Sequence, residues 1–238
     1  MAYTTINKHT DYFNTVTFTG NNSTQNITGV GFQPDWVWLK KRNGTANHHV
    51  VDAVRGVGYY LYPNLTNAQG GNGSSLLTAF GADGFTLDNG ADSNGSGAEG
   101  VSWNWKANGQ GSANTEGSIN TTYTSVNTTA GFSIIKYTGS GSVGTIGHGL
   151  GAKPNVIFQK KLDSSAAWTV YHDHFSDNPA EKYLYLNSTA ALGDYADHWN
   201  DTEPTSSLIT LGTDTSVNGS GVANIIYAFT EKTGYSKF

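Results

Sequence analysis

Two closely spaced histidines are the residues whose types and spacing most directly suggest chemistry. If His172-Asp173-His174 lies in a β-strand, the alternation of side chains places both imidazoles on one face of the strand. The chain contains an internal repeat, described below, and His48-His49 lies in the corresponding segment of its first copy. Imidazole is a common zinc ligand, but a metal site needs at least a third ligand, and the sequence names none. We therefore expect polar surface or interface histidines here, and no metal site.

An oxygen-rich run at residues 88–95 is the other candidate for holding an ion. Asp88 and Asp92, with the neighbouring asparagines and serine, supply hard oxygen ligands of the kind that suits Ca²⁺. The run lacks the spacing of an EF-hand loop, and Asx turns explain its composition. We expect no cofactor, with Ca²⁺ near Asp88 and Asp92 as the weak alternative.

The sequence lacks the common signatures of catalysis. It contains no Gly-x-Ser-x-Gly elbow, no phosphate-binding loop and no His-Glu-x-x-His, and no helix is predicted after the Gly-x-Gly-x-x-Gly match that begins at Gly139. Most acidic residues of the first copy of the repeat have no acidic counterpart in the second copy, since Asp35 corresponds to Asn155 and Asp52 to His172. A duplicated carboxylate pair for glycoside hydrolysis is therefore absent, and we predict that the protein is not an enzyme.

The composition excludes several classes of partner. The chain has 238 residues, of which only 13% are charged, with 30 glycines, no cysteine and a net charge of -5. Without a cationic patch we expect no binding to nucleic acid, and without a long apolar run or an apolar N-terminal region we expect neither membrane insertion nor Sec export. The absence of cysteine excludes disulfides and Cys-based zinc sites.

An internal repeat organises the chain. Residues 13–20 match 132–139, residues 29–41 match 149–161, residues 60–66 match 183–189, and residues 94–97 match 218–221. The offset drifts only from 119 (132 minus 13) to 124 (218 minus 94) over four matches in order. We therefore predict a first repeat at residues 1–107, a Gly/Asn/Ser/Thr-rich linker with one possible strand at 108–131, and a second repeat with a C-terminal extension at 132–238.

Each repeat shows the pattern of an all-β domain. Period-two patterning bounded by turn residues predicts two tandem antiparallel, jelly-roll-like β-sandwiches. In the last strand of the first repeat, Val101, Trp103 and Trp105 alternate with polar residues, so we expect them to face the core. Their counterparts Ile225, Tyr227 and Phe229 alternate with Ile226 and Ala228, which predicts an outer face that a domain or subunit covers.

Aromatic side chains are the candidates for binding sugars, because their faces stack on sugar rings. Four tryptophans lie in strand patterns that read as core: Trp36, Trp38, Trp103 and Trp105. The remaining surface candidates for glycan or partner contact are Tyr59, Tyr62, Trp168, Tyr195 and Trp199. For subunit contact the candidates are Ile226, Tyr235 and Phe238, with the C-terminal residues 235–238 docking on a neighbour as an added strand.

Several blocks of the sequence resemble a repeated domain of virion surface proteins, often tail fibres, of marine bacteriophages. They are Met-Ala-Tyr-Thr-Thr-Ile-Asn-Lys at 1–8, Gly-Val-Gly-Phe-Gln-Pro-Asp-Trp-Val at 29–37, Asp-Ala-Val-Arg-Gly at 52–56, Trp-Asn-Trp-Lys at 103–106 and Gly-Tyr-Ser-Lys-Phe at 234–238. The resemblance spans essentially the whole chain. In that family the last block commonly leads into another repeat, whereas this chain ends there.

The resemblance implies a non-enzymatic virion component and supplies no catalytic residues. It implies a tail fibre or adhesin that attaches to the host, made in the host cytoplasm and located in the virion after lysis. Its expected partners are other virion proteins, further copies in a closed homo-oligomer such as a trimer, and a host surface glycan. A capsid decoration protein and a stand-alone glycan-binding module are the alternatives.

Overall fold

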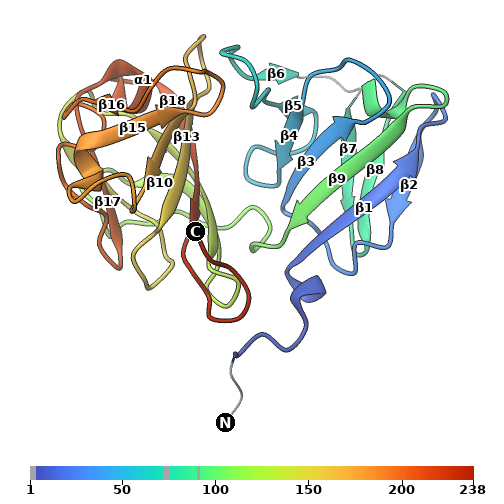
Figure 1. Ribbon diagram of the computed structural model, residues 1–238, viewed down its shortest axis with the longest axis horizontal. Coiled ribbons are helices and arrows are strands. Elements are labelled where there is room, and N and C mark those ends of the chain that lie inside the picture. The colour runs from blue at the N-terminus through green and yellow to red at the C-terminus, as the bar shows by residue number, and fades with distance from the viewer. Residues whose placement is uncertain (1–3, 72–75, 90–91) are drawn as a thin grey trace. The chain divides into compact units, whose positions relative to one another are not determined.

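The computed structural model describes residues 4–71, 76–89 and 92–238 and is all-β, with 39% strand and 6% helix (Figure 1). The chain divides into an N-terminal unit, Asn7–Gln110, and a C-terminal unit, Gly111–Phe238, to which residues 4–6 also belong. The division falls inside the predicted linker 108–131, most of which is part of the C-terminal unit.

The N-terminal unit contains a four-stranded sheet, a three-stranded sheet and a short hairpin. The first sheet has the order β1 (Phe13–Thr19), β9 (Glu99–Trp105), β3 (Trp36–Lys41) and β4 (His49–Asp52). The second has the order β2 (Gln25–Thr28), β8 (Gly84–Leu87) and β7 (Leu77–Gly81), and the hairpin is β5 (Tyr59–Tyr60) with β6 (Gly70–Gly71). Two 3₁₀ turns, η1 (His9–Asp11) and η2 (Asp92–Asn94), complete the unit.

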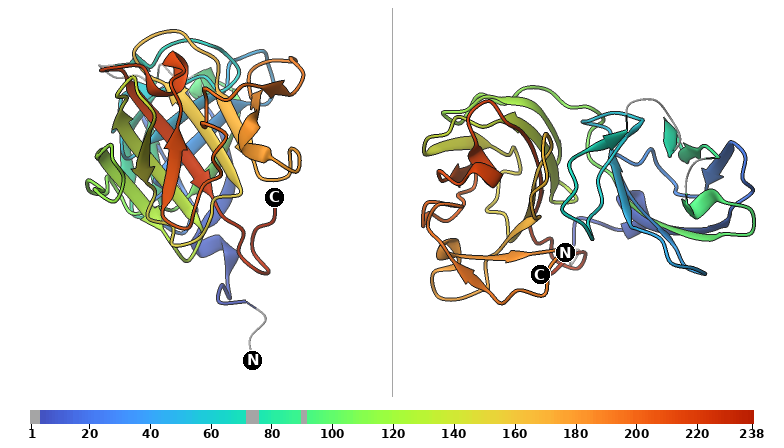
Figure 2. Two further views of the ribbon diagram at one scale, coloured as in Figure 1. Left: turned by 90° about the vertical axis from the view of Figure 1, so that its left-hand side faces the viewer. Right: turned by 90° about the horizontal axis from the view of Figure 1, so that it is seen from above.

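The C-terminal unit contains a seven-stranded sheet and a two-stranded sheet (Figure 2, left). The large sheet has the order β10 (Thr121–Asn127), β11 (Phe132–Thr138), β18 (Ala223–Phe229), β13 (Val156–Lys161), β14 (Thr169–His172), β15 (Lys182–Tyr185) and β16 (Gly193–Asp194). The small one pairs β12 (Gly144–Gly147) with β17 (Leu208–Leu211). The helical turns are η3 (Pro179–Glu181) and α1 (Thr215–Asn218). Strand β10 lies in the predicted linker and extends this sheet.

Strands have matching neighbours in the two units. The order β1-β9-β3-β4 of the first corresponds to β11-β18-β13-β14 of the second, and β2-β8 corresponds to β12-β17. All of these pairs are antiparallel. The strands β9 and β18 therefore lie between corresponding neighbours in the two sheets.

The inner face of β9 is the polar one, so the expectation that Val101, Trp103 and Trp105 face the sandwich core is wrong. Ser102 pairs with Leu39, and Asn104 pairs with Val37, and directly paired residues share a face of the sheet. Leu39 and Val37 belong to the core between the two sheets. Ser102 and Asn104 are tolerated there because the Asn104 amide donates to the Ser102 Oγ at 3.0 Å and to the Asn14 carbonyl at 3.0 Å.

The same correction applies to β18 and removes Ile226 as a subunit contact. Ile226 and Ala228 are buried in the core of their own unit, together with Ile135 and Ile157. Tyr227, which alternates with them, therefore lies on the opposite face. Alternation along this strand predicts which residues share a face. Because both faces of β18 are apolar, alternation does not predict which face points into the core.

The C-terminal segment folds back on its own unit. Lys232 and Ser236 form an isolated bridge, which makes a tight turn of the residues between them. The Phe238 ring lies 5.8 Å from the Phe229 ring, and the Phe238 N–H donates to the Glu231 carboxylate at 3.0 Å. Tyr235 is half-buried. Within the chain, these residues form a turn and not the extended strand expected for docking on a neighbour.

Buried asparagines fix equivalent loops in the two units. The Asn94 amide donates to the carbonyls of Ser23 and Asp88, each at 2.8 Å. The Asn218 amide donates to the carbonyls of Ser142 and Gly212 at 2.8 and 2.7 Å. Both asparagine side chains are fully buried, and each ties two loop carbonyls of its unit together through hydrogen bonds.

No helix in the described ranges has the length and apolar character needed to cross a membrane.

Replacing Asn218 by Ala should destabilise the C-terminal unit. The variant leaves the buried Gly212 carbonyl and the Ser140 N–H, which donates to Asn218 at 2.9 Å, without these partners, and it removes one of the two donors to the Ser142 carbonyl. We expect a loss of about 2–3 kcal/mol in the free energy of unfolding, measured by urea denaturation. The exposed Asn120→Ala is the control and should change it by less than about 0.5 kcal/mol. Equal effects of the two substitutions would show that the buried amide has no such role.

Candidate functional site

A pair of tyrosines begins the candidate site in each unit. Tyr60-Leu61-Tyr62 and Tyr183-Leu184-Tyr185 place their two rings on the same side of the chain, because alternate residues of an extended segment share a face. The ring centroids are 5.2 Å apart in the first pair and 5.1 Å apart in the second. Burial, followed by the hydrogen bond between the paired hydroxyls, raises the pKa of Tyr62 and of Tyr185 to about 12.

Glycine in the neighbouring strand makes room for the first tyrosine of each pair. Tyr60 pairs with Gly70, and Tyr183 pairs with Gly193. A Cβ atom at either glycine would collide with the tyrosine ring opposite it. Each hairpin therefore holds its ring flat against the glycine backbone, which fixes the orientation of the aromatic surface.

A histidine packs against each tyrosine pair, but it comes from a different place in the chain. His49, in β4, lies 5.4 Å from the Tyr60 ring and 4.9 Å from the Tyr62 ring. In the C-terminal unit the His198 ring stacks on Tyr183 at 4.2 Å, with an interplanar angle of 20°. Leu39 pairs with His49 as Gln159 pairs with Thr169, so the strand position of His49 holds a threonine in the second unit.

Burial lowers the pKa of both histidines. It lowers the pKa of His49 to about 4, against the opposing effect of the Asp92 carboxylate. The pKa of His198 is lowered by burial as well, and the carboxylates of Asp214 and Asp197 oppose that shift. Both rings are therefore neutral at pH 7, when each has one N–H donor and one acceptor nitrogen.

Several polar atoms around His198 lack a protein partner. Both ring nitrogens of His198, the Trp199 Nε1 and the Tyr171 hydroxyl are buried and make no hydrogen bond within the described part of the chain. Buried polar groups usually have a partner. The region around His198 therefore has unsatisfied hydrogen-bonding capacity, and the His198 ring lies close to the exposed ring of Tyr195.

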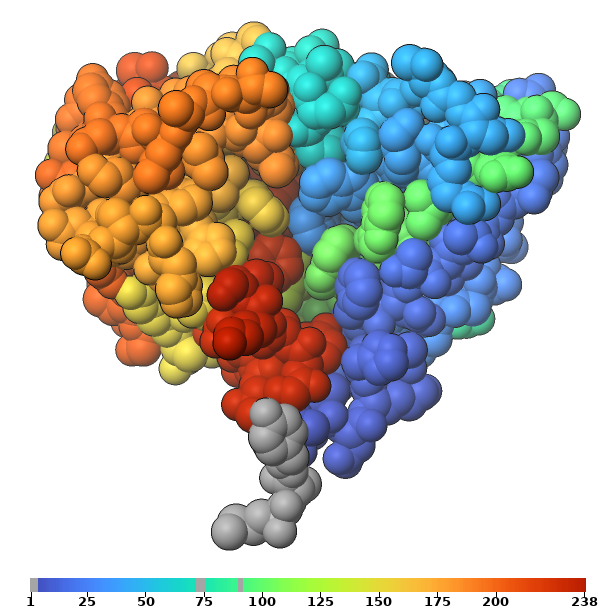
Figure 3. All heavy atoms as spheres, viewed as in Figure 1, coloured from blue at the N-terminus to red at the C-terminus, as the bar shows by residue number. Residues whose placement is uncertain are grey.

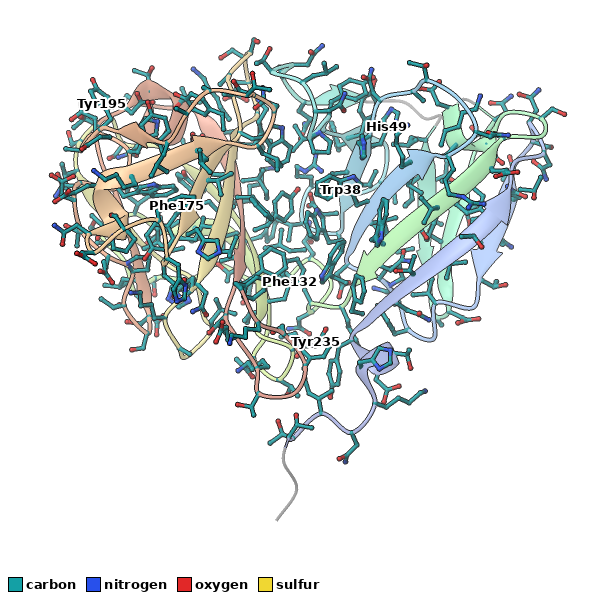
Figure 4. All side chains as sticks on the ribbon, viewed as in Figure 1. Trp38, His49, Phe132, Phe175, Tyr195 and Tyr235 are labelled. Atoms are coloured by element: carbon teal, nitrogen blue, oxygen red, sulfur yellow. The ribbon has the colours of Figure 1, made fainter. Side chains whose placement is uncertain are left out.

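The exposed aromatic residue above this cluster is Tyr195. Its side chain is 48% exposed, at the edge of the unit (Figure 4), and its ring lies edge-on to His198 at 5.7 Å. The Asp197 carboxylate accepts a hydrogen bond from the Tyr195 hydroxyl and so raises the pKa of that hydroxyl. The loop between β15 and β16 adds two exposed apolar side chains, Leu186 and Leu192, and belongs to the orange surface in Figure 3.

Charged groups flank this surface. The Lys182 Nζ lies 2.6 Å from the Asp194 carboxylate, across the β15–β16 hairpin. Together with Asp197, this pair places hydrogen-bonding groups beside the exposed Tyr195 ring. An apolar ring face bordered by carboxylates and an ammonium suits a ligand that combines C–H surfaces with hydroxyl groups.

The structure separates the predicted contact residues. Tyr195 is exposed, whereas Tyr59 and Tyr62 are half-buried in the N-terminal unit. The prediction that Trp168 and Trp199 are surface aromatics is wrong, since both are buried. The Trp199 ring packs in the core against Tyr171 at 6.1 Å, and the Trp168 ring stacks on Tyr227 at 6.2 Å. Large apolar rings are more favourable in such packing than in water.

Sequence reasoning missed Tyr183 and His198, the two rings that stack beneath Tyr195. A signal for Tyr183 was present, because Tyr-x-Tyr is one of the repeated blocks. No signal existed for His198, which lies 15 residues further along the chain (198 minus 183) and meets Tyr183 only through the fold.

The described residues contain one group able to ligate a metal ion, His172, Asp173 and His174, whose ligand atoms lie within 4.8 Å of one another. The expected alternation of these residues along a strand is wrong, because β14 ends at His172 and a turn follows. Asp88 and Asp92 are not part of such a group. Asp88 instead accepts hydrogen bonds from the Thr24 hydroxyl at 3.1 Å and the Asn89 N–H at 2.8 Å. Residues 90–91 of the Ca²⁺ candidate lie outside the described residues.

The chain belongs to the family described as Domain of unknown function (DUF7483), whose model matches residues 8–238. No curated protein and no solved structure matches the chain.

Acid should destabilise the N-terminal unit through His49, which is labelled in Figure 4. Its pKa in the folded protein, about 4, lies below the ordinary value of 6.5, so the unfolded chain binds the proton first as the pH falls. Stability is then complete above pH 6.5 and falls by up to about 1.4 kcal/mol per pH unit between pH 6.5 and 4. We expect His49→Gln to remove this contribution when urea unfolding is compared at pH 7 and pH 5.

The exposed His9→Gln is the matched control and should keep the wild-type dependence on pH. Part of the slope will persist in His49→Gln, because burial also lowers the pKa of His48 in the same unit. An unchanged slope in His49→Gln would mean that the His49 ring does not titrate as its burial requires.

Proposed function

We propose that this protein is a non-enzymatic structural component of a bacteriophage virion, of the tail-fibre or adhesin type, that contacts host surface glycans through its C-terminal unit. The observation that carries the proposal is the exposed Tyr195 ring above His198 and Tyr183, on a surface bordered by carboxylates. The resemblance of the sequence to virion surface proteins of marine phages supports the virion setting.

The chemistry of this surface suits a sugar. The C–H face of a sugar ring packs on an aromatic face, as it would on Tyr195, while its hydroxyl groups need donors and acceptors nearby. Asp194, Asp197 and Lys182 supply such groups. Gly193, opposite Tyr183, fixes the orientation of the Tyr183 ring that lies below Tyr195. Little conformational entropy is therefore lost at this ring when a ligand binds.

Two carboxylates, Asp35 and Asp83, serve as structural ties to distant backbone groups, which supports a non-enzymatic role. Asp35 is buried and accepts hydrogen bonds from the N–H groups of Ala107 at 2.7 Å and Gly109 at 3.1 Å. Asp83 accepts from the N–H groups of Gly29 and Gly31, which lower its pKa. Carboxylates bound to backbone amides in this way fix loops, and this structural use is consistent with the proposed non-enzymatic role.

The matching strand neighbours support a further part of the proposal, that the two units are copies of one jelly-roll-like sandwich module. The order of four strands and the buried Asn94 and Asn218 occur in both units at corresponding places. A repeated module of this kind suits an extended virion appendage, in which copies of one fold are placed in series.

Tyr195→Ala should weaken glycan binding. We expect at least about a tenfold loss of affinity for the glycans selected on an array, because the stacking surface is removed. Tyr195→Phe keeps the ring and should retain most of the binding. Val143→Ala, at an apolar side chain of the same unit that is 51% exposed, is the matched control and should bind as the wild type does. Equal binding by Tyr195→Ala and wild type would overturn the assignment of this surface.

The location of the protein in a particle tests the other half of the proposal. Antibodies raised against the purified chain should label the tails of phage particles in immuno-electron microscopy. Labelling over the capsid would identify a decoration protein instead. Glycan binding without any labelling of particles would identify a stand-alone glycan-binding module.

A further inference from the structure

We propose that His172, Asp173 and His174 form a binding site for a transition-metal ion such as Zn²⁺ in the C-terminal unit. The three residues are consecutive, and one ligand atom from each lies within 4.8 Å of the others. The site does not depend on the glycan-binding surface or on the virion role. It is defined by the turn that follows β14.

The spacing of the ligand atoms fits a tetrahedral ion. The Asp173 Oδ1 lies 2.8 Å from the His174 Nδ1 and 3.4 Å from the His172 Nδ1. Bonds of about 2.0–2.1 Å in a tetrahedral zinc site imply ligand atoms separated by about 3.3 Å. These two separations bracket that value, and all three ligand atoms lie within 4.8 Å of one another, so side-chain rotations that bring the imidazoles together would place an ion between these atoms.

The Asp173 carboxylate is held in position by a neighbouring strand end. The Asn155 amide donates to the Asp173 Oδ2 at 2.6 Å, and the Asp173 N–H donates to the Asn155 carbonyl at 2.9 Å. The first bond occupies one carboxylate oxygen and leaves the other directed at the two imidazoles. Metal sites commonly use outer-shell hydrogen bonds of this type to orient their ligands.

The N-terminal unit has the same turn without these ligands, which shows that the fold does not require them. There the Ala53 N–H donates to the Asp35 carbonyl at 2.8 Å, as the Asp173 N–H does to Asn155. Trp36 pairs with Asp52 as Val156 pairs with His172. The C-terminal unit has Asp173 in place of an alanine, and Asn155 in place of an aspartate that could not donate a hydrogen bond to it.

The donor set and its exposure indicate which ions would bind. Two imidazoles and one carboxylate suit Zn²⁺, Ni²⁺ or Cu²⁺, and not Ca²⁺ or Mg²⁺, which prefer oxygen ligands. The Asp173 side chain is 12% exposed and those of His172 and His174 are 28% and 69% exposed, so solvent reaches the group. No lysine or arginine in the described ranges forms an ion pair with Asp173 that would neutralise it.

Two contacts limit how the histidines respond to an ion. The Phe175 side chain, labelled in Figure 4, packs against the His172 ring at 5.5 Å and restricts its rotation. The His174 backbone N–H donates to the His172 Nδ1 at 3.1 Å, a hydrogen bond that an ion at this nitrogen would replace. The loss of one such hydrogen bond is small beside the free energy of a zinc site.

The test is metal binding by the untagged full-length chain. We expect equimolar binding of Co²⁺, with a visible spectrum that Zn²⁺ displaces, and equimolar Zn²⁺ binding in calorimetry. His172→Gln and His174→Gln should each weaken Zn²⁺ binding by at least about tenfold. His9→Gln, at an exposed histidine outside the group, is the matched control and should bind as the wild type does.

A second measurement avoids the risk that a variant misfolds. Bound Co²⁺ should broaden or shift the NMR signals of His172 and His174 in the wild-type protein and leave those of His9 unchanged. Failure of the wild type to bind Zn²⁺ or Co²⁺, binding that the two substitutions leave unaltered, or paramagnetic effects centred on other residues would each overturn the proposal. The Tyr195 variants serve as an independent check, since they should bind Zn²⁺ as the wild type does.

Discussion

The hydrogen-bond ladders on both edges of β9 and β18 are the constraint on which the rest of each unit depends. Each of these strands is paired with one strand on either side, so its backbone is satisfied within the sheet and its side chains must alternate between two faces. The second, smaller sheet covers one face, which fixes the register. A shift of one residue would exchange Ile226 with Tyr227 and remove the core of the C-terminal unit.

Loops in both units are fixed by amides and carboxylates more than by ion pairs. Only 13% of the residues are charged, and Asn94, Asn218, Asp35 and Asp83 each hold backbone groups of segments far away in the sequence. The hydrogen bonds of these side chains to the backbone hold the glycine-rich loops in place. The loops can therefore remain polar and still present side chains in defined positions.

The two candidate sites lie where the units differ although their strands correspond. His49 and His198 approach a tyrosine pair from different parts of the chain, and among the residues that the structure describes, the second arrangement alone has an exposed ring, Tyr195, beside it. In the turn after β14, Asp173 and Asn155 replace Ala53 and Asp35 while the backbone hydrogen bond stays the same. A scaffold whose backbone is already hydrogen-bonded tolerates such changes, so the groups of the two proposed sites can be present in the second unit and absent from the first.

The sequence by itself determined the all-β class and the last strand of each repeat, because alternation acts within a few residues. It also indicated a strand in the region of β10, and it identified Tyr195 as a surface aromatic. Only the tertiary structure decided that Ser102 and Asn104 face the core, that Trp168 and Trp199 are buried, and that His198 stacks on Tyr183. Because β14 ends at His172, the turn that follows places the Asp173 carboxylate close to both neighbouring imidazoles. A period of two residues defines two faces of a strand, but which face is buried depends on what packs against it, and those partners are distant in the sequence.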